Sequence, residues 1–163
     1  MARITPQQAG GVNVVAFLDM LAWSEGTDNG RQPTTNEGYD VLVGGGLFTD
    51  LSKHPAKLVR LSAKLSSTAA GRYQFLSRTW GVLQKQLMLP DFGPISQDRG
   101  CIELIRGRKA LDAVKAGQFE RGVALCAREW ASLPGAGYGQ HEKGLDKLRA
   151  IYRKAGGLVG GVA

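Results

Sequence analysis

The residue whose type and position best suit acid–base chemistry is Glu25, which follows an apolar run in the stretch FLDMLAWSEGTDNG. Leu18 and Glu25 are seven residues apart. Two helical turns take about 7.2 residues, so Glu25 prolongs the apolar face of a helix. Partial burial, the negative end of the helix dipole and the nearby Asp28 each disfavour a charged carboxylate. A carboxyl group held toward its neutral form can act as a general acid. The alternative is a solvated glutamate on a frayed helix end.

Glu25 must be positioned by the helix before it and by the segment after it. Apolar residues recur at three- and four-residue spacing and predict a helix from Asn13 to Ser24, which Gly26 then stops. Residues 26–50 are punctuated by Gly, Pro and Asn, which predicts turns with a small sheet. We expect its strands at Tyr39–Val43 and Leu47–Thr49, with a third near Leu65–Thr68.

From Tyr73 onward the apolar spacing is helical. The expected helices are Gln74–Gln86, Gln97–Arg106 with Ser96 as its cap, Arg108–Lys115, Gln118–Ala131 and His141–Ala155. The sequence therefore predicts an α+β fold with a long N-terminal helix, a small glycine-rich β-sheet lobe and a larger helical lobe, with a cleft between the lobes. We expect one domain over residues 1–163, with flexible ends over 1–12 and 157–163.

Charge is distributed unevenly along the chain. The formal net charge is +7. Residues 1–50 contain six acidic and two basic side chains, whereas residues 51–90 contain seven basic side chains and no acidic one. A basic body attracts an anionic polymer, either nucleic acid or the acidic bacterial envelope. The sequence shows no zinc spacing, recognition-helix pattern or aromatic RNA motif, so we expect no specific nucleic-acid partner.

Several classes of protein are excluded by composition. No apolar run approaches the roughly 20 residues that cross a bilayer, and the N-terminus lacks the continuous apolar stretch of a signal peptide. We therefore expect no membrane insertion and a cytoplasmic product. Cys101 and Cys126 lie in apolar helical patterns and are expected to be buried thiols, although pairing stays open. His54 and His141 have no cysteine at ligand spacing, so we predict no metal site.

Four longer stretches carry a resemblance to a known family. FLDMLAWSEGTDNGRQ, GYDVLVGG with LFTD, STAAGRYQFLSRTW and WASLPGAGYGQ strongly resemble the phage lambda-type endolysins, which are peptidoglycan lytic transglycosylases of the lysozyme superfamily. The resemblance covers about Phe17 to Gly157. It implies a lysozyme-like fold in which a sugar polymer crosses the cleft between the lobes.

The resemblance also implies a reaction and a role for Glu25. In such enzymes a single glutamic acid protonates the glycosidic oxygen between N-acetylmuramic acid and N-acetylglucosamine. The carboxylate then takes a proton from the C6 hydroxyl of the muramoyl sugar, which closes a 1,6-anhydro ring without water. The implied partner is the peptidoglycan glycan strand, with no cofactor. Release by a holin is implied too, with the protein in the host cytoplasm until lysis and then at the periplasm and cell wall. We expect a monomer.

Asp40 and Glu37 are candidate second carboxylates. A hydrolase that uses two carboxyl groups would place one of them about 5–5.5 Å or roughly 6.5–9.5 Å from the catalytic acid, according to its stereochemistry. Asp40 lies in GYDV, where the resemblance implies a strand of the cleft. We therefore predict that Asp40 binds or orients substrate, with a turn aspartate as the alternative.

The stretch GRYQ resembles the glycine-to-glutamine motif of lytic transglycosylases. Gly71 would let the backbone approach a sugar, Arg72 could meet a lactyl or peptide carboxylate, and Gln74 offers a donor and an acceptor. Tyr73, in the same motif, is predicted to bind substrate. The alternatives are a core position for Tyr73 and a helix-capping role for Gln74. Tyr138 in LPGAGYGQ would be a sugar platform. The three tryptophans, Trp23, Trp80 and Trp130, are expected in the core.

Three alternative functions remain open from the sequence. A muramidase would hydrolyse the same bond with the same fold. A basic nucleic-acid-binding domain and a wall-binding module without activity are the other two. Replacing Glu25 separates the enzymes from the binding modules.

Overall fold

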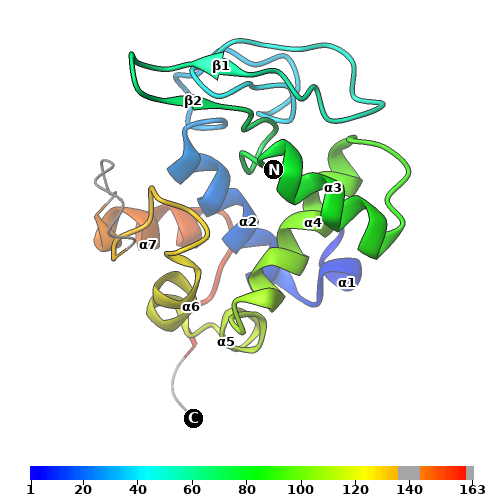
Figure 1. The fold of residues 1–163 in the computed structure, drawn as a ribbon. Helices are drawn as coiled ribbons and strands as arrows, with labels where there is room; N and C mark the ends of the chain where they lie inside the picture. Colours follow the sequence, from blue (N-terminus) through cyan, green and yellow to red (C-terminus); the bar gives the residue numbers. More distant parts are fainter. Residues whose placement is uncertain (136–143, 161–163) are drawn as a thin grey trace.

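The computed structural model describes residues 1–135 and 144–160. Among the described residues, most elements are helices, and one pair of short strands lies between the second and third helix (Figure 1). The elements are α1 (Pro6–Ala9), α2 (Val12–Glu25), β1 (Val59–Arg60), β2 (Ser66–Ser67), α3 (Ser77–Leu87), α4 (Pro94–Gly107), α5 (Leu111–Lys115), α6 (Phe119–Cys126) and α7 (Leu145–Lys154). The segment between α2 and α3 forms a separate layer over one end of the helices, which confirms the predicted α+β class.

Helix α2 lies at the centre of the helical lobe. Its residues from Val14 to Leu18 and from Met20 to Ala22 are all buried, because α1, α4, α5 and α7 pack around it. The predicted helix is confirmed and extends to Glu25. α2 is covered on nearly all sides, and the Asp19 side chain is 11% exposed and paired with Arg72. A helix buried all round shows little amphipathic periodicity.

The sheet is smaller than predicted. β1 and β2 pair antiparallel, with Val59 opposite Ser67 and Arg60 opposite Ser66, so the strand expected near residues 65–68 is confirmed. The two strands expected over 39–43 and 47–49 are reduced to isolated bridges, Val41 with Leu47 and Leu42 with Ala70. Positive φ angles at Gly44 and Gly45 bend the chain there into a tight turn, and pairing cannot continue.

The helices after residue 73 occur near their predicted positions with shifted bounds, and the helix expected over Gln118–Ala131 already ends at Cys126. α3 begins at Ser77 rather than Gln74, because Phe75 pairs with Ala70 across a tight turn. α4 begins at Pro94 with Gly93 as N-cap, so the prediction that Ser96 caps it is wrong; the Ser96 hydroxyl donates to Asp91 instead. Cys101 and Cys126 are buried free thiols.

The N-terminal segment belongs to the core. We expected residues 1–12 to be flexible, but Ala2 and Ile4 are buried, and a capping box at Thr5 starts α1. The backbone N–H groups of Arg3 and Ile4 donate to the carboxylate of Asp98 on α4, at 2.8 and 2.9 Å. At the other end, Gly160 N–H donates to Gly117 O, and residues 161–163 lie outside the described part.

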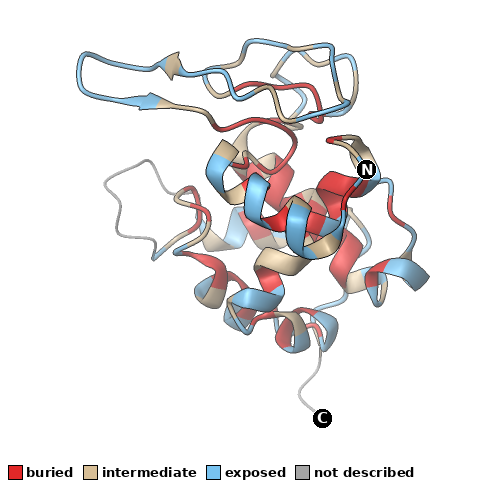
Figure 2. Cartoon of the chain, turned by 45° about the vertical axis from the view of Figure 1, so that its right-hand side comes forward, coloured by how far each residue is buried: buried red, intermediate tan, exposed pale blue. Residues whose placement is uncertain are grey.

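The two layers differ in how far their residues are buried. Buried residues concentrate in the helices, whereas the β1–β2 hairpin is exposed along most of its length (Figure 2). Within residues 1–135 and 144–160, no helix is long and apolar enough to cross a membrane.

Candidate active site

Glu25 is the last residue of α2, at the end that faces the layer formed by residues 26–76 (Figure 1). The helix stops there because Gly26 adopts a left-handed conformation, with φ 79°, and its N–H closes the last turn onto Ala22 and Trp23. The Glu25 side chain is partly buried. The predicted position of this carboxyl group, at the end of a buried helix, is therefore what the fold provides.

Two serines form a hydrogen-bonded chain to Glu25. The hydroxyl of Ser132 donates to Glu25 Oε2 at 2.7 Å, and the hydroxyls of Ser24 and Ser132 are 2.8 Å apart. A serine has one hydrogen to donate. Because the hydroxyl hydrogen of Ser132 is donated to Glu25, the hydroxyl of Ser24 must donate to the hydroxyl oxygen of Ser132. Both serines are buried, at 2% and 8% exposure, so the chain holds the carboxyl group in place.

The turn from Gly71 to Gln74 joins the two segments that meet at Glu25. The Thr27 hydroxyl, two residues after Glu25, donates to Arg72 O at 2.6 Å. The indole N–H of Trp130, two residues before Ser132, donates to Tyr73 O at 3.0 Å. The backbone of the GRYQ motif therefore positions both the catalytic candidate and the serine that contacts it.

Gly71 is required by interior packing. Its φ is 85°, and a Cβ atom there would lie 2.4 Å from Gln97 Oε1 and 2.8 Å from Phe92 Cζ. Its N–H donates to Val41 O. A side chain at Gly71 would collide with these core groups. Packing in the interior is therefore enough to explain why this position is glycine, and no approach to a sugar is needed.

Arg72 is buried with a 1% exposed side chain. Its guanidinium donates to Asp19 on α2 at 2.7 Å, to Asp28 at 2.6 Å and to the carbonyl of Glu37. It thus joins α2 to the loop that follows Glu25. A side chain so placed presents almost no surface to a substrate carboxylate.

Tyr73 is a core residue, which was the alternative to its predicted role in substrate binding. It is 1% exposed, and its hydroxyl donates to Asp98 Oδ1 at 2.6 Å. Burial raises the pKa of Tyr73 well above its usual value, and the Asp98 charge raises it further, so the hydroxyl remains a donor. Asp98 also accepts from the Tyr39 hydroxyl.

Gln74 keeps surface for a ligand. It adopts a left-handed backbone with φ 56°, which is uncommon outside glycine and costs about 1 kcal/mol or more. Its amide N–H₂ donates to Gly71 O at 2.9 Å and to Val41 O at 3.2 Å. The side chain lines a cavity of about 60 Å³ together with Trp130, so its predicted contact with substrate stays a prediction that the geometry permits.

The two candidate second carboxylates are engaged elsewhere. Asp40 is 3% exposed and accepts from the hydroxyls of Thr34 and Thr35 and from Thr35 N–H. Burial would raise the pKa of Asp40, but these hydrogen bonds outweigh it and hold the pKa below its usual value. Glu37 accepts from the N-terminal amine at 2.8 Å, which lowers the pKa of Glu37. Asp40 therefore fits the role of a turn aspartate.

The remaining predicted residues are Tyr138 and the three tryptophans. Tyr138 lies outside the described residues. Trp80 and Trp130 are buried, at 1% and 2% exposure, as expected, whereas Trp23 is partly buried beside Lys147. Among the described residues, no group of three or more His, Cys, Asp or Glu side chains could hold a metal ion.

Sequence reasoning missed Ser24, Ser132 and Asp98. Ser24 directly precedes Glu25, and Ser132 lies within the quoted WASLPGAGYGQ, so both were close to recognised motifs. No local pattern links Ser132 to a residue 107 positions away.

A family model described as Endolysin matches residues 15–159. The endolysin of Escherichia phage lambda is 59% identical over 144 residues, which cover 88% of this chain and 91% of the relative. The endolysin of Escherichia phage P2 is 52% identical over 157 residues, covering 90% and 94%. The resemblance seen in the sequence is confirmed.

Solved structures give the same result for the fold. Bacteriophage lambda lysozyme complexed with a chitohexasaccharide matches with a TM-score of 0.90 and 55% identity, covering 98% of this chain and 99% of that one. A second structure of lysozyme from bacteriophage lambda matches with a TM-score of 0.86 and 53% identity over the same shares. The predicted lysozyme-like fold is therefore confirmed.

Proposed function

Because this chain belongs to the endolysin family, we propose that it cleaves bacterial peptidoglycan between N-acetylmuramic acid and N-acetylglucosamine as a lytic transglycosylase. Glu25 is the single acid and base of this reaction, which leaves 1,6-anhydromuramic acid ends. The match to a lysozyme that was solved with a chitohexasaccharide supports a glycan substrate. The positive net charge favours an anionic wall polymer.

The observation that carries the one-carboxyl mechanism is the engagement of the other acids near Glu25 in the sequence. Each of the other five acidic side chains in residues 1–50 already has a partner: Asp19 and Asp28 pair with Arg72, Glu37 with the N-terminal amine, Asp40 with Thr34 and Thr35, and Asp50 with Ser52. A two-carboxyl hydrolysis needs an acid aimed at the sugar from the opposite side. Asp40, the candidate for that second acid, is 3% exposed and is held by Thr34 and Thr35, which favours internal attack by the sugar's own hydroxyl.

The reaction balances without water. Protonated Glu25 gives its proton to the glycosidic oxygen, and the bond from that oxygen to the muramoyl C1 breaks. The C6 hydroxyl of the same sugar attacks C1, and Glu25, now a carboxylate, takes the hydroxyl proton. One C–O bond breaks and one forms, the carboxyl group ends as it began, and the leaving sugar keeps a new 4-hydroxyl.

Ser132 holds the carboxyl group through both proton transfers. Its hydrogen bond reaches Glu25 Oε2, and a hydrogen bond to an ionised acceptor is stronger than one to a neutral acceptor. The contact is therefore strongest after Glu25 has donated its proton. The buried donor behind it, Ser24, keeps Ser132 oriented toward Glu25.

Mass spectrometry of digested peptidoglycan tests the proposal. Anhydro products are lighter by one water than hydrolysed products. Glu25→Gln removes the transferable proton with little change of shape, so turnover should fall at least 100-fold, in line with the loss of a general acid. Normal wall binding and an unchanged melting temperature are the controls. Reducing ends on the products would replace the proposal with hydrolysis, and a variant that keeps a tenth of normal activity would contradict a sole acid/base.

Two further expectations belong to the same proposal. We propose that the protein stays in the host cytoplasm until a holin opens the membrane, and that it acts as a monomer. Expression with and without a holin, followed by cell fractionation and turbidity, tests the first. Size-exclusion chromatography with light scattering tests the second. Lysis without a membrane lesion, or a dimer mass, would contradict the respective expectation.

A further inference from the structure

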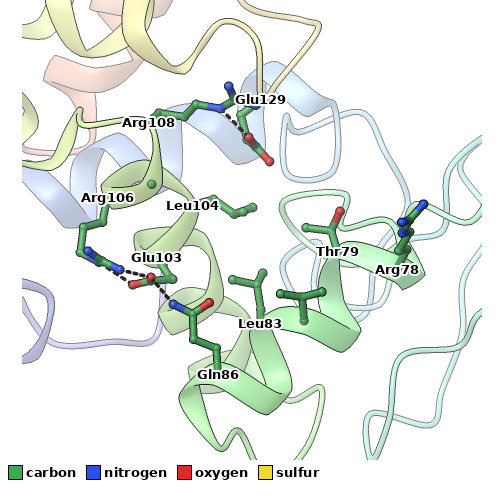
Figure 3. Close-up of a pocket in the computed structure, with 11 residues that line it drawn as sticks. Arg78, Thr79, Leu83, Gln86, Glu103, Leu104, Arg106, Arg108 and Glu129 are labelled. Carbon is green, nitrogen blue, oxygen red and sulfur yellow. Dashed lines mark hydrogen bonds and ion pairs between the residues drawn. The ribbon is translucent and has the colours of Figure 1, made fainter.

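A second surface feature lies on the helical lobe, between α3 and α4. It is a cavity of about 580 Å³ that is also bordered by Glu129, in the segment after α6 (Figure 3). Most of its lining residues belong to α3 and α4, and Arg108 and Glu129 come from the segments that follow α4 and α6. Nothing in the proposed cleavage chemistry uses it.

The cavity is positively charged. Three arginines line it, against two glutamates. Arg106 pairs with Glu103, and Arg108 Nε donates to Glu129 at 2.7 Å, so both glutamates are neutralised in place. Arg78 forms no ion pair with any residue in the described ranges, and its side chain is on the exposed first turn of α3. One guanidinium therefore remains to receive an anionic group.

The same cavity has apolar and neutral polar walls. Leu83 is buried at its base, and Val82 is 62% exposed beside it. The Thr79 hydroxyl and the Gln86 amide supply hydrogen-bonding groups, and Gln86 is held by a bond from its N–H₂ to Glu103. In Figure 3, Arg78 and Arg106 stand on opposite sides, with Leu83 between them. An occupant with carboxylates, amides and aliphatic carbons would match these walls.

This cavity adjoins a smaller one beside Gln74. The two cavities share Thr79, Leu104 and Glu129 as lining residues. Gln74 is the residue of the GRYQ motif that keeps exposed surface and is predicted to contact substrate. The groove therefore lies next to the predicted substrate contact.

We propose that this groove binds the acidic peptide that peptidoglycan carries on the lactyl group of its muramoyl sugar. The inference rests on the proposed function, since it assumes that the muramoyl sugar lies at Glu25. A peptide carboxylate pairs with Arg78, amide groups meet Thr79 and Gln86, and aliphatic side chains cover Val82. The groove thereby selects glycan strands that carry peptides over bare strands.

The test compares one glycan in two forms. Peptidoglycan strands with their peptides, and the same strands after an amidase has removed the peptides, are digested by the wild type, by Arg78→Ala and by Arg99→Ala. Arg99 is a matched control because it is exposed on α4 and does not line the groove. For the wild type we expect a lower KM on peptide-bearing strands. In Arg78→Ala the ratio of the two KM values should shrink by roughly threefold to tenfold, as for the loss of one charge-assisted contact, whereas Arg99→Ala should keep it.

A second measurement is independent of cleavage. A synthetic acidic stem peptide is titrated into ¹⁵N-labelled protein, and amide shifts are expected at Thr79, Leu83 and Leu104. Equal KM values on both strand forms, an equal effect of Arg78→Ala and Arg99→Ala, or peptide shifts elsewhere would overturn the groove while leaving the cleavage proposal intact. If neither strand form is cleaved, the cleavage proposal fails, and the peptide titration still decides whether the groove binds.

Discussion

Replacing Arg72 with methionine should destabilise the fold and not merely weaken substrate binding. The guanidinium is 1% exposed and holds Asp19 and Asp28, so its loss leaves Asp19 without a cation and Asp28 with only the N-terminal amine at 3.8 Å. Removing one partner of a buried ion pair typically costs about 3–5 kcal/mol. Asp28 is 30% exposed, and Asp19 keeps the N–H of Ala2, so we expect the lower end, about 3 kcal/mol.

Thermal unfolding measures this effect. For a chain of this size, about 3 kcal/mol corresponds to a fall of roughly 6–12 °C in melting temperature. Arg72→Lys keeps the charge but cannot reach both carboxylates in one fork, so it should fall between the wild type and the methionine variant. Adding Asp19→Asn to Arg72→Met should recover part of the loss, because it removes one uncompensated charge.

The sequence-based interpretation of Arg72 makes the opposite prediction. A side chain that binds a substrate carboxylate would raise KM when replaced and leave the melting temperature unchanged. A methionine variant within 1 °C of the wild type, with a raised KM, would refute the structural role derived from burial and pairing.

Three other predictions follow from single contacts. Ser132→Ala should lower kcat roughly tenfold because it releases the Glu25 carboxyl group, and should lower the free energy of unfolding by about 1–2 kcal/mol because Ser24 loses its acceptor. Adding Ser24→Ala should restore stability but not kcat, as measured by thermal unfolding and turnover. Gly71→Ala should lower the urea unfolding free energy by about 3 kcal/mol through overpacking and a left-handed backbone, and a loss under about 1 kcal/mol would contradict the packing argument. Burial lowers the pKa of His54 below its usual 6.5, and the hydrogen bond from its ring to Phe75 O offsets only part of this effect. The folded state therefore binds fewer protons than the unfolded state below that pH, so stability falls on acidification; urea melts of His54→Gln should lack this component.

Local sequence signals predicted the elements near Glu25 well. The apolar run followed by Gly26 predicted α2 and its end within one residue, because a left-handed glycine stops a helix whatever surrounds it. Glu25 was identified from helical spacing as prolonging the apolar face, and it is partly buried. These statements depend on residues close together in the chain.

Contacts between residues that are far apart in the chain could not be predicted from the sequence. Residues 1–12 were predicted to be a flexible end because the groups that hold them are distant in the chain; Asp98, which accepts from Arg3 and Ile4, lies more than 90 positions away. The strand expected over Tyr39–Val43 fits the local composition, but the left-handed glycines at 44 and 45 turn the chain tightly, and only isolated bridges form. Arginine is rarely buried, so no local rule predicts that Arg72 lies in the interior between two carboxylates.

The family, the α+β class and Glu25 as the candidate acid could all be predicted from the amino-acid sequence, because long motifs and helical periodicity are local properties of the chain. Tertiary structure alone decided which groups act on that acid. Ser132 reaches Glu25 across 107 positions, and Arg72 and Tyr73 position both segments through backbone carbonyls while their side chains are buried. The physical reason is that a hydrogen bond or ion pair depends on distance in space, which a one-dimensional pattern does not contain.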